Sequence, residues 1–199
     1  NQVLAKLAKK NKLFTVYVTN GSWTKETLNI LGPYLDAANV DLKGFSEKSC
    51  AKQGAFFGQI PQMLIYAQKK HHIFLEITTL LIPGINDDLK EVAQMTKWIV
   101  NNLGPNTPWH LTQYDPHLAP DKEFKKIPYT STEQLTQAAE IGRKQGLKFV
   151  YLWASSSNYG QADTICPQCE NLAIRRFGYQ VQILGVDNKG NCNKCGRSL

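Results

Sequence analysis

The sequence predicts an α/β protein with a parallel sheet, followed by a small metal-binding module. Apolar, β-rich stretches alternate with stretches of helical periodicity along most of the 199 residues, which favours parallel strands joined by right-handed helical crossovers. No G-x-G-x-x-G turn follows a strand, which counts against a dinucleotide site. Four of the five cysteines gather after residue 165 at the spacing of metal ligands. A partial or complete α/β barrel is therefore our first choice of fold, and an open doubly wound sheet is the second.

The expected elements follow one another in a regular order. We expect strands at about residues 13–18, 38–42, 73–82, 109–114 and 149–153, and helices at about 1–8, 24–31, 61–70, 89–103 and 131–145. The fourth helix has the clearest apolar stripe, in which Leu89, Val92, Thr96, Ile99 and Leu103 recur at helical spacing. The five strands and their helices predict a barrel-like body over residues 1–160, with a ribbon over 161–199.

Capping residues predict where three of the helices begin. Thr24 is suited to cap the second helix, and either Asn86 or Asp87 the fourth. Ser131 and Gln134 have the spacing of a capping box at the start of the fifth.

The composition limits the partners that we expect. The net charge is +7, and residues 165–199 hold five basic and only two acidic residues. A Lys-rich soluble surface explains this, and a nucleic-acid or acidic partner is the alternative. Only four residues are Arg, the usual base-reading residue, although Arg175, Arg176 and Arg197 lie in the tail. The scarcity of Arg therefore counts against nucleic acid as a partner, while the position of these three residues keeps that alternative open.

Neither a membrane span nor a leader is visible in the sequence. No apolar run approaches the ~20 residues needed to cross a bilayer, and the first residues, which do not begin with Met, show no signal-peptide pattern. Together with the clustered cysteines, these features predict a cytoplasmic protein without membrane contact.

Polar residues stand at the predicted strand ends, where both candidate folds bind ligands. The first strand ends in Thr19, Asn20 and Gly21, which form either a ligand-binding turn or an ordinary Asn-Gly turn. Asp41 and Lys43 end the second strand two residues apart and so point the same way. If that face is buried, the two charges must pair with each other or with a zwitterionic ligand. If the strand ends earlier, both are solvated.

The residues at the ends of the third and fourth predicted strands indicate a ligand site less specifically. Pro83 and Gly84 form either a rigid apolar turn on which a flat ring of a ligand can pack, or a plain turn before a helix. Tyr114 and Asp115 are either ligand contacts or loop anchors. The four histidines share no helical or strand spacing, so we interpret them as surface or structural residues.

The cysteine tail is the strongest local signal. Cys166 and Cys169 form one C-x₂-C pair, and Cys192 and Cys195 a second one 22 residues further on. Two such pairs bring four thiolates around one tetrahedral ion. The pattern predicts a structural zinc ribbon, with a rubredoxin-like iron site or two disulfides as alternatives. The intervening stretch 175–183 alternates as a strand would. Cys50 stands alone and is expected to be a half-buried thiol without a catalytic role.

The ordered strand ends resemble the radical S-adenosylmethionine (SAM) superfamily. The likeness rests on five segments: Val18–Gly21, Asn39–Lys43, Thr78–Asp87, Pro108–His110 and the cysteine tail. It is closest to the branch that is similar to pyruvate formate-lyase-activating enzymes, and within it to the radical enzyme of the AmmeMemoRadiSam system. The resemblance runs over essentially the whole chain.

The resemblance implies a partial barrel that binds SAM at its strand ends. Asp41 and Lys43 would lie near the methionyl or ribose part, beside Thr19, Asn20 and Gly21. Pro83 and Gly84 would approach the adenine. Where the family often has His, this chain has Asp115 after Tyr114, which departs from the family pattern on the adenine side.

A larger departure concerns the cluster of this family. A 4Fe-4S cluster on a C-x-x-x-C-x-x-C loop would generate the 5′-deoxyadenosyl radical, and this chain has no such loop. We therefore expect a C-terminal piece of a longer polypeptide that is inactive alone, with a protein as a possible substrate. The alternatives are a zinc-ribbon module that binds nucleic acid or a partner protein, and a relative that binds its ligand without a cluster.

Overall fold

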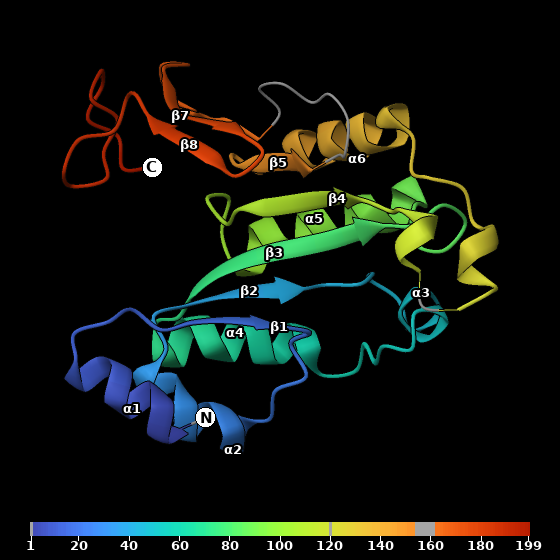
Figure 1. The fold of residues 1–199 in the computed structure, drawn as a ribbon, viewed down its shortest axis with the longest axis horizontal. Coiled ribbons are helices and arrows are strands. Elements are labelled where there is room, and N and C mark those ends of the chain that lie inside the picture. The colour runs from blue at the N-terminus through green and yellow to red at the C-terminus, as the bar shows by residue number, and fades with distance from the viewer. Residues whose placement is uncertain (1, 120, 154–161) are drawn as a thin grey trace.

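The computed structural model describes residues 2–119, 121–153 and 162–199. Two sheets organise these residues (Figure 1). A five-stranded parallel sheet contains β1 (Val16–Thr19), β2 (Ala37–Asp41), β3 (Phe74–Leu81), β4 (Trp109–Gln113) and β5 (Val150–Trp153). A three-stranded antiparallel sheet contains β6 (Thr164–Ile165), β7 (Leu172–Phe177) and β8 (Gln180–Ile183).

Within the described residues, six α-helices accompany the parallel sheet. They are α1 (Gln2–Lys10), α2 (Lys25–Leu31), α3 (Glu47–Lys52), α4 (Ile60–His71), α5 (Leu89–Asn102) and α6 (Thr132–Lys144). Short 3-10 helices lie at Gly32–Tyr34, Pro116–Leu118 and Phe124–Lys126. No helix in the described parts of the chain is long and apolar enough to span a membrane.

The strand order decides between the two candidate folds. The strands lie in the sequential order β1-β2-β3-β4-β5, and every neighbouring pair is parallel. Right-handed crossovers in a constant direction place all connecting helices on one face of the sheet. A doubly wound sheet would instead reverse its order at a switch point. The parallel sheet is therefore a partial barrel, as the first choice predicted.

The two faces of the sheet differ in chemistry. On the helix-covered face, buried apolar side chains pack into the main core, among them Val40, Ile77, Trp109 and Leu111. On the opposite face, alternate residues of the same strands are half-buried and many are polar. That face corresponds to the interior of a barrel.

Local signals explain the helix boundaries, with one correction. Thr24 caps α2, and the capping box of Ser131 and Gln134 begins α6, as predicted. The cap of α5 is Asp88 rather than Asn86 or Asp87: the Asp88 carboxylate accepts hydrogen bonds from the backbone N–H groups of Lys90 and Glu91.

Three further expectations need correction. The first strand begins at Val16, three residues later than predicted, because Thr15 instead bonds Tyr34 and Asp36. The predicted strand 175–183 is a hairpin of β7 and β8, since Gly178 has a φ of +54° and turns the chain. Helix α3 was not predicted, although Ser46 caps it by accepting from the Ser49 N–H. The proposed module boundary near residue 160 lies outside the described residues.

Candidate functional site

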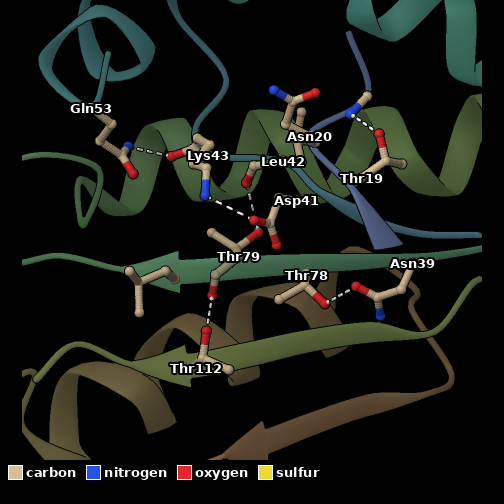
Figure 2. Close-up of polar contacts among 12 residues, drawn as sticks. Thr19, Asn20, Asn39, Asp41, Leu42, Lys43, Gln53, Thr78, Thr79 and Thr112 are labelled. Carbon is tan, nitrogen blue, oxygen red and sulfur yellow. Dashed lines mark hydrogen bonds and ion pairs between the residues drawn. The ribbon is translucent and has the colours of Figure 1, made fainter. Parts of the chain in front are cut away.

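The carboxyl ends of β1 and β2 bring three predicted residues together. Asn20, Asp41 and Lys43 line one hollow of about 190 Å³. The Lys43 Nζ donates to the Asp41 Oδ2 at 2.8 Å, and each of these side chains is about one-third exposed (30% and 40%). Figure 2 shows that the two charges point toward each other beside Asn20. The pairing follows from their two-residue spacing, and it leaves the outer faces of both groups accessible.

Thr19 and Gly21 fix the backbone at the end of β1, next to this hollow. The Gly21 N–H donates to the Thr19 hydroxyl at 3.2 Å, and the backbone at Gly21 has a φ of +75°. A Cβ on Gly21 would lie only 2.9 Å from the Val40 side chain and 3.2 Å from that of Ile60. Gly21 therefore lets the end of β1 pack tightly against β2 and α4 and holds Asn20 at the rim.

A larger cavity adjoins this hollow. Its volume is about 500 Å³, and it lies at the ends of β3 and β4, with Lys43 shared between the two spaces. Tyr114 and Asp115 line it. The volume of this larger cavity is in the range that small-molecule ligands occupy.

The residues on the β4 side are held by structural contacts. Tyr114 is buried, and its hydroxyl donates to the Phe124 carbonyl at 2.7 Å. Asp115 accepts from the His117 N–H at 2.8 Å and caps the 3-10 helix that follows. Both are therefore loop anchors that also form part of the cavity wall.

Pro83 and Gly84 occupy the turn after β3. Gly84 is exposed and lines a separate hollow beside α3 and the start of α5. The Lys52 Nζ donates to its carbonyl at 3.0 Å, and Lys52 also lines the larger cavity. Lys52 therefore links this turn to the larger cavity, although the turn itself lines the separate hollow.

A polar network on the inner sheet face was missed by the sequence analysis. The Asn39 Oδ1 accepts from the Thr78 hydroxyl at 2.8 Å, and the Glu76 Oε2 lies 3.1 Å from the His110 Nε2. The His110 ring stacks on Tyr151 at 5.1 Å. His110 therefore belongs to a barrel-interior cluster rather than to the surface. The sequence feature that could have indicated this network is Glu76, a carboxylate within the most apolar of the predicted strands.

Electrostatics keep the carboxylate of this network ionised. The hydrogen bond from His110 outweighs burial and holds the pKa of Glu76 below its usual value. Burial raises the pKa of Tyr151, so its phenol stays neutral.

The four tail cysteines form a compact metal-ligand set. Their sulfur atoms all lie within 4.8 Å of one another, and the pairs Cys166–Cys195 and Cys169–Cys192 are 3.6 Å apart. Four thiolates at ~2.3 Å from one tetrahedral ion have sulfurs separated by about 3.8 Å. All four are free thiols, so the disulfide alternative is not realised. Burial raises the pKa of the Cys192 thiol. Hydrogen bonds from the backbone N–H groups of Lys194 and Cys195 outweigh this effect and lower the pKa to about 6.

None of the five thiols fits a 4Fe-4S cluster. The ribbon sulfurs are as close as a single ion requires, whereas a four-iron cluster spreads its thiolates over four metal atoms. Cys50 is buried rather than half-buried as expected, and burial raises the pKa of its thiol. The five thiols, all of which lie in the described parts of the chain, therefore do not form a ligand set for the 4Fe-4S cluster that the sequence resemblance implies.

Sequence comparison finds archaeal relatives, while no protein-family profile matches the chain. It is 31% identical over 197 residues to "Uncharacterized protein MJ0808" of Methanocaldococcus jannaschii, covering 97% of this chain and 56% of that protein. It is 25% identical over 144 residues to the same organism's "Putative glycyl-radical enzyme activating enzyme MJ1227", covering 68% of this chain and 57% of that protein. The chain thus spans about half the length of the curated relatives that it matches.

Solved structures show the same architecture. A domain of the pyruvate-formate lyase-activating enzyme from Bacteroides vulgatus superposes with a TM-score of 0.63 and 17% identity, covering 77% of this chain and 89% of that domain. A radical SAM methyltransferase from Sphaerobacter thermophilus gives 0.58 and 14% identity, covering 74% and 43% of the two chains. The chain has the partial-barrel fold of the radical SAM proteins, in agreement with the resemblance seen in its sequence.

Proposed function

We propose that this chain is the SAM-binding and substrate-facing part of a radical SAM enzyme related to the glycyl-radical-enzyme activases. The observation that carries the proposal is the convergence of Asn20, Asp41 and Lys43 on a hollow that adjoins the 500 Å³ strand-end cavity. Asp41 would accept from an ammonium or ribose hydroxyl of SAM, and Lys43 would donate to its carboxylate. Gly21 would hold Asn20 in place beside them, while Tyr114, Asp115 and the turn of Pro83 and Gly84 would bound the adenine side.

We propose further that the 4Fe-4S cluster is supplied by residues outside these 199. Such a cluster would supply the electron needed for reductive cleavage of SAM. The open edge at β1 supports this arrangement, because Val16 and Val18 are 59% and 83% exposed there. Exposed apolar residues on a sheet edge are suited to pairing with further strands. A protein substrate, such as the activases' partner enzymes, fits the open inner face of the barrel.

Titration of the chain with SAM in a calorimeter tests the binding step. We expect saturable binding that weakens at least about tenfold in Asp41→Asn, since one hydrogen-bonded charge is worth ~1.5–3 kcal/mol. Glu133→Gln, on the exposed first turn of α6, is the matched control and should bind as the wild type does. Absence of saturable binding, or equal affinity in Asp41→Asn, would remove this site assignment.

We propose zinc as the ribbon metal and a structural role for it, because a closed four-thiolate site leaves no position open for a substrate. The ribbon also offers a second candidate function, the binding of a partner protein. All four residues of β8 are exposed, and Val181 and Ile183 are 57% and 70% so. Nucleic acid is less suited, since the Arg176 Nη1 is already bonded to Thr164 and Ala162. Steeply salt-dependent RNA or DNA binding that flattens in Arg175→Ala would reverse that preference.

A further inference from the structure

A second cavity lies at the opposite end of the sheet from the strand-end site. Its volume is about 450 Å³, and it opens between the amino-terminal ends of β3 to β5 and the ribbon. In Figure 1 the ribbon and the carboxyl terminus lie at that end of the strands. The walls are mainly apolar and include Phe74, Phe149 and Ile174, whereas Glu76 and Arg176 are the charged side chains among the lining residues. Apolar walls with a few convergent polar groups are typical of small-molecule sites.

The two charges share the cavity without pairing. Within the described parts of the chain, the ion-pair partner of Glu76 is His110, and Glu76 forms no ion pair with Arg176. The charge of Arg176 nevertheless contributes to the low pKa of Glu76, after the larger effect of the His110 hydrogen bond. The two groups therefore interact electrostatically within one cavity without forming an ion pair.

Each charge is held by its own support. The Glu76 Oε2 is bound by His110 at 3.1 Å and contacted by the Asn39 amide at 3.5 Å. The Arg176 Nη1 donates to the Thr164 hydroxyl at 2.7 Å and to the Ala162 carbonyl at 2.9 Å. These hydrogen bonds hold the Glu76 carboxylate and the Arg176 guanidinium in place and keep them from pairing directly. Binding a ligand between preorganised groups costs less ordering entropy than binding it to free side chains.

Tyr151 stands between the two supports and fixes their orientation. Its ring is stacked by His110 on one side and lies 5.4 Å from the Arg176 guanidinium carbon. Its hydroxyl is 3.0 Å from the Thr164 hydroxyl, which links β5 of the barrel to β6 of the ribbon. The cavity is thus built by both sheets.

We propose that this cavity binds a small zwitterion with an apolar body, an apolar amino acid or a short peptide. Its ammonium group would bind Glu76, its carboxylate would bind Arg176, and its side chain would lie against Phe74, Phe149 and Ile174. This site is distinct from the proposed SAM site and does not depend on it.

Calorimetric titration of the full chain with phenylalanine and with leucyl-phenylalanine tests the proposal. At least one of the two should bind saturably below about 10 mM, and the tighter binder distinguishes an amino-acid site from a peptide site. N-acetylphenylalanine lacks the ammonium group and phenylalaninamide lacks the carboxylate. We expect each of these, or the correspondingly blocked dipeptide, to bind at least about tenfold more weakly. These comparisons use the wild-type chain and so do not depend on a variant folding.

Variants then locate the site. Glu76→Gln and Arg176→Gln should each weaken the zwitterion at least about tenfold. Arg175→Gln is the matched control, because Arg175 is the exposed neighbour on the other face of β7 and should leave affinity unchanged. No saturable binding of either probe, equal binding of the blocked ligands, or full affinity in Glu76→Gln would overturn the proposal. SAM titration of the same variants keeps the two sites apart, since loss of SAM binding alone bears on the proposed function only.

Discussion

Gly21 shows how one residue controls the spacing of the strand-end site. A methyl group there would meet Val40 and Ile60 at 2.9 and 3.2 Å, in a backbone conformation with a φ of +75°. We expect Gly21→Ala to lower the free energy of unfolding by about 2–4 kcal/mol, from combined strain and overpacking. Urea denaturation measures this.

Gly54→Ala is the control for the backbone contribution. Its φ is +64°, and a Cβ there meets no atom within 4 Å, so it should cost only about 1–2 kcal/mol. Equal losses in the two variants would show that the close approach to Val40 and Ile60 is not what requires glycine at residue 21.

Thr79 of β3 contacts β4 and the residue that follows β2 through one buried hydroxyl. It accepts from the Trp109 indole N–H at 3.1 Å and donates to the Leu42 carbonyl at 3.1 Å. Thr79→Val keeps the shape but leaves the buried indole N–H unpaired, so we expect a loss of about 1–3 kcal/mol in unfolding free energy. Thr79→Ser should restore most of it. A Val variant as stable as the wild type would contradict this role for the hydroxyl.

At the scale of elements, the clearest test is the start of α6. The Ser131 Oγ accepts from the Gln134 N–H at 3.1 Å, and the Gln134 Oε1 accepts from the Ser131 N–H at 2.9 Å. Ser131→Ala should lower the unfolding free energy by about 1 kcal/mol. Thr132→Ala changes the adjoining exposed position and should stay within about 0.5 kcal/mol of the wild type. Thermal or urea denaturation of the pair gives the difference directly.

Elements were predicted where their signals are local. The apolar stripe of α5 and the capping box of α6 depend on residues within one or two turns, and both were predicted. The start of β1 was misplaced, because the backbone N–H of Thr15 is bonded to the side chain of Asp36, a residue far along the chain. The periodicity of a sequence segment does not indicate a hydrogen-bond partner so far away along the chain.

At the scale of the whole molecule, the ribbon is expected to depend on its metal. Its sheet has few buried apolar residues, of which Ala173 is one, so metal binding of roughly 10–16 kcal/mol would supply the folding energy. We expect one metal ion per chain, and loss of the β7–β8 amide signals on chelation while those of the barrel persist. Elemental analysis and NMR spectra measure both.

Cysteine variants complete that test. Cys192→Ser should release the ion, whereas Cys50→Ser should retain it, since Cys50 is a buried residue of α3 and does not belong to the four-cysteine group. A colourless protein with bound metal would support zinc, and visible absorbance would indicate iron. A metal-free ribbon that is unaffected by chelators would contradict the site.

The sequence by itself determined the alternation of strands and helices, the four-cysteine metal set and the polar character of the strand ends, because these follow from local periodicity and spacing. Only the tertiary structure decided that the strands run in sequential order and that Glu76, His110 and Tyr151 meet across three strands. Those contacts join residues tens of positions apart. They depend on strand register and on which face each side chain takes, and neither is encoded in any short segment.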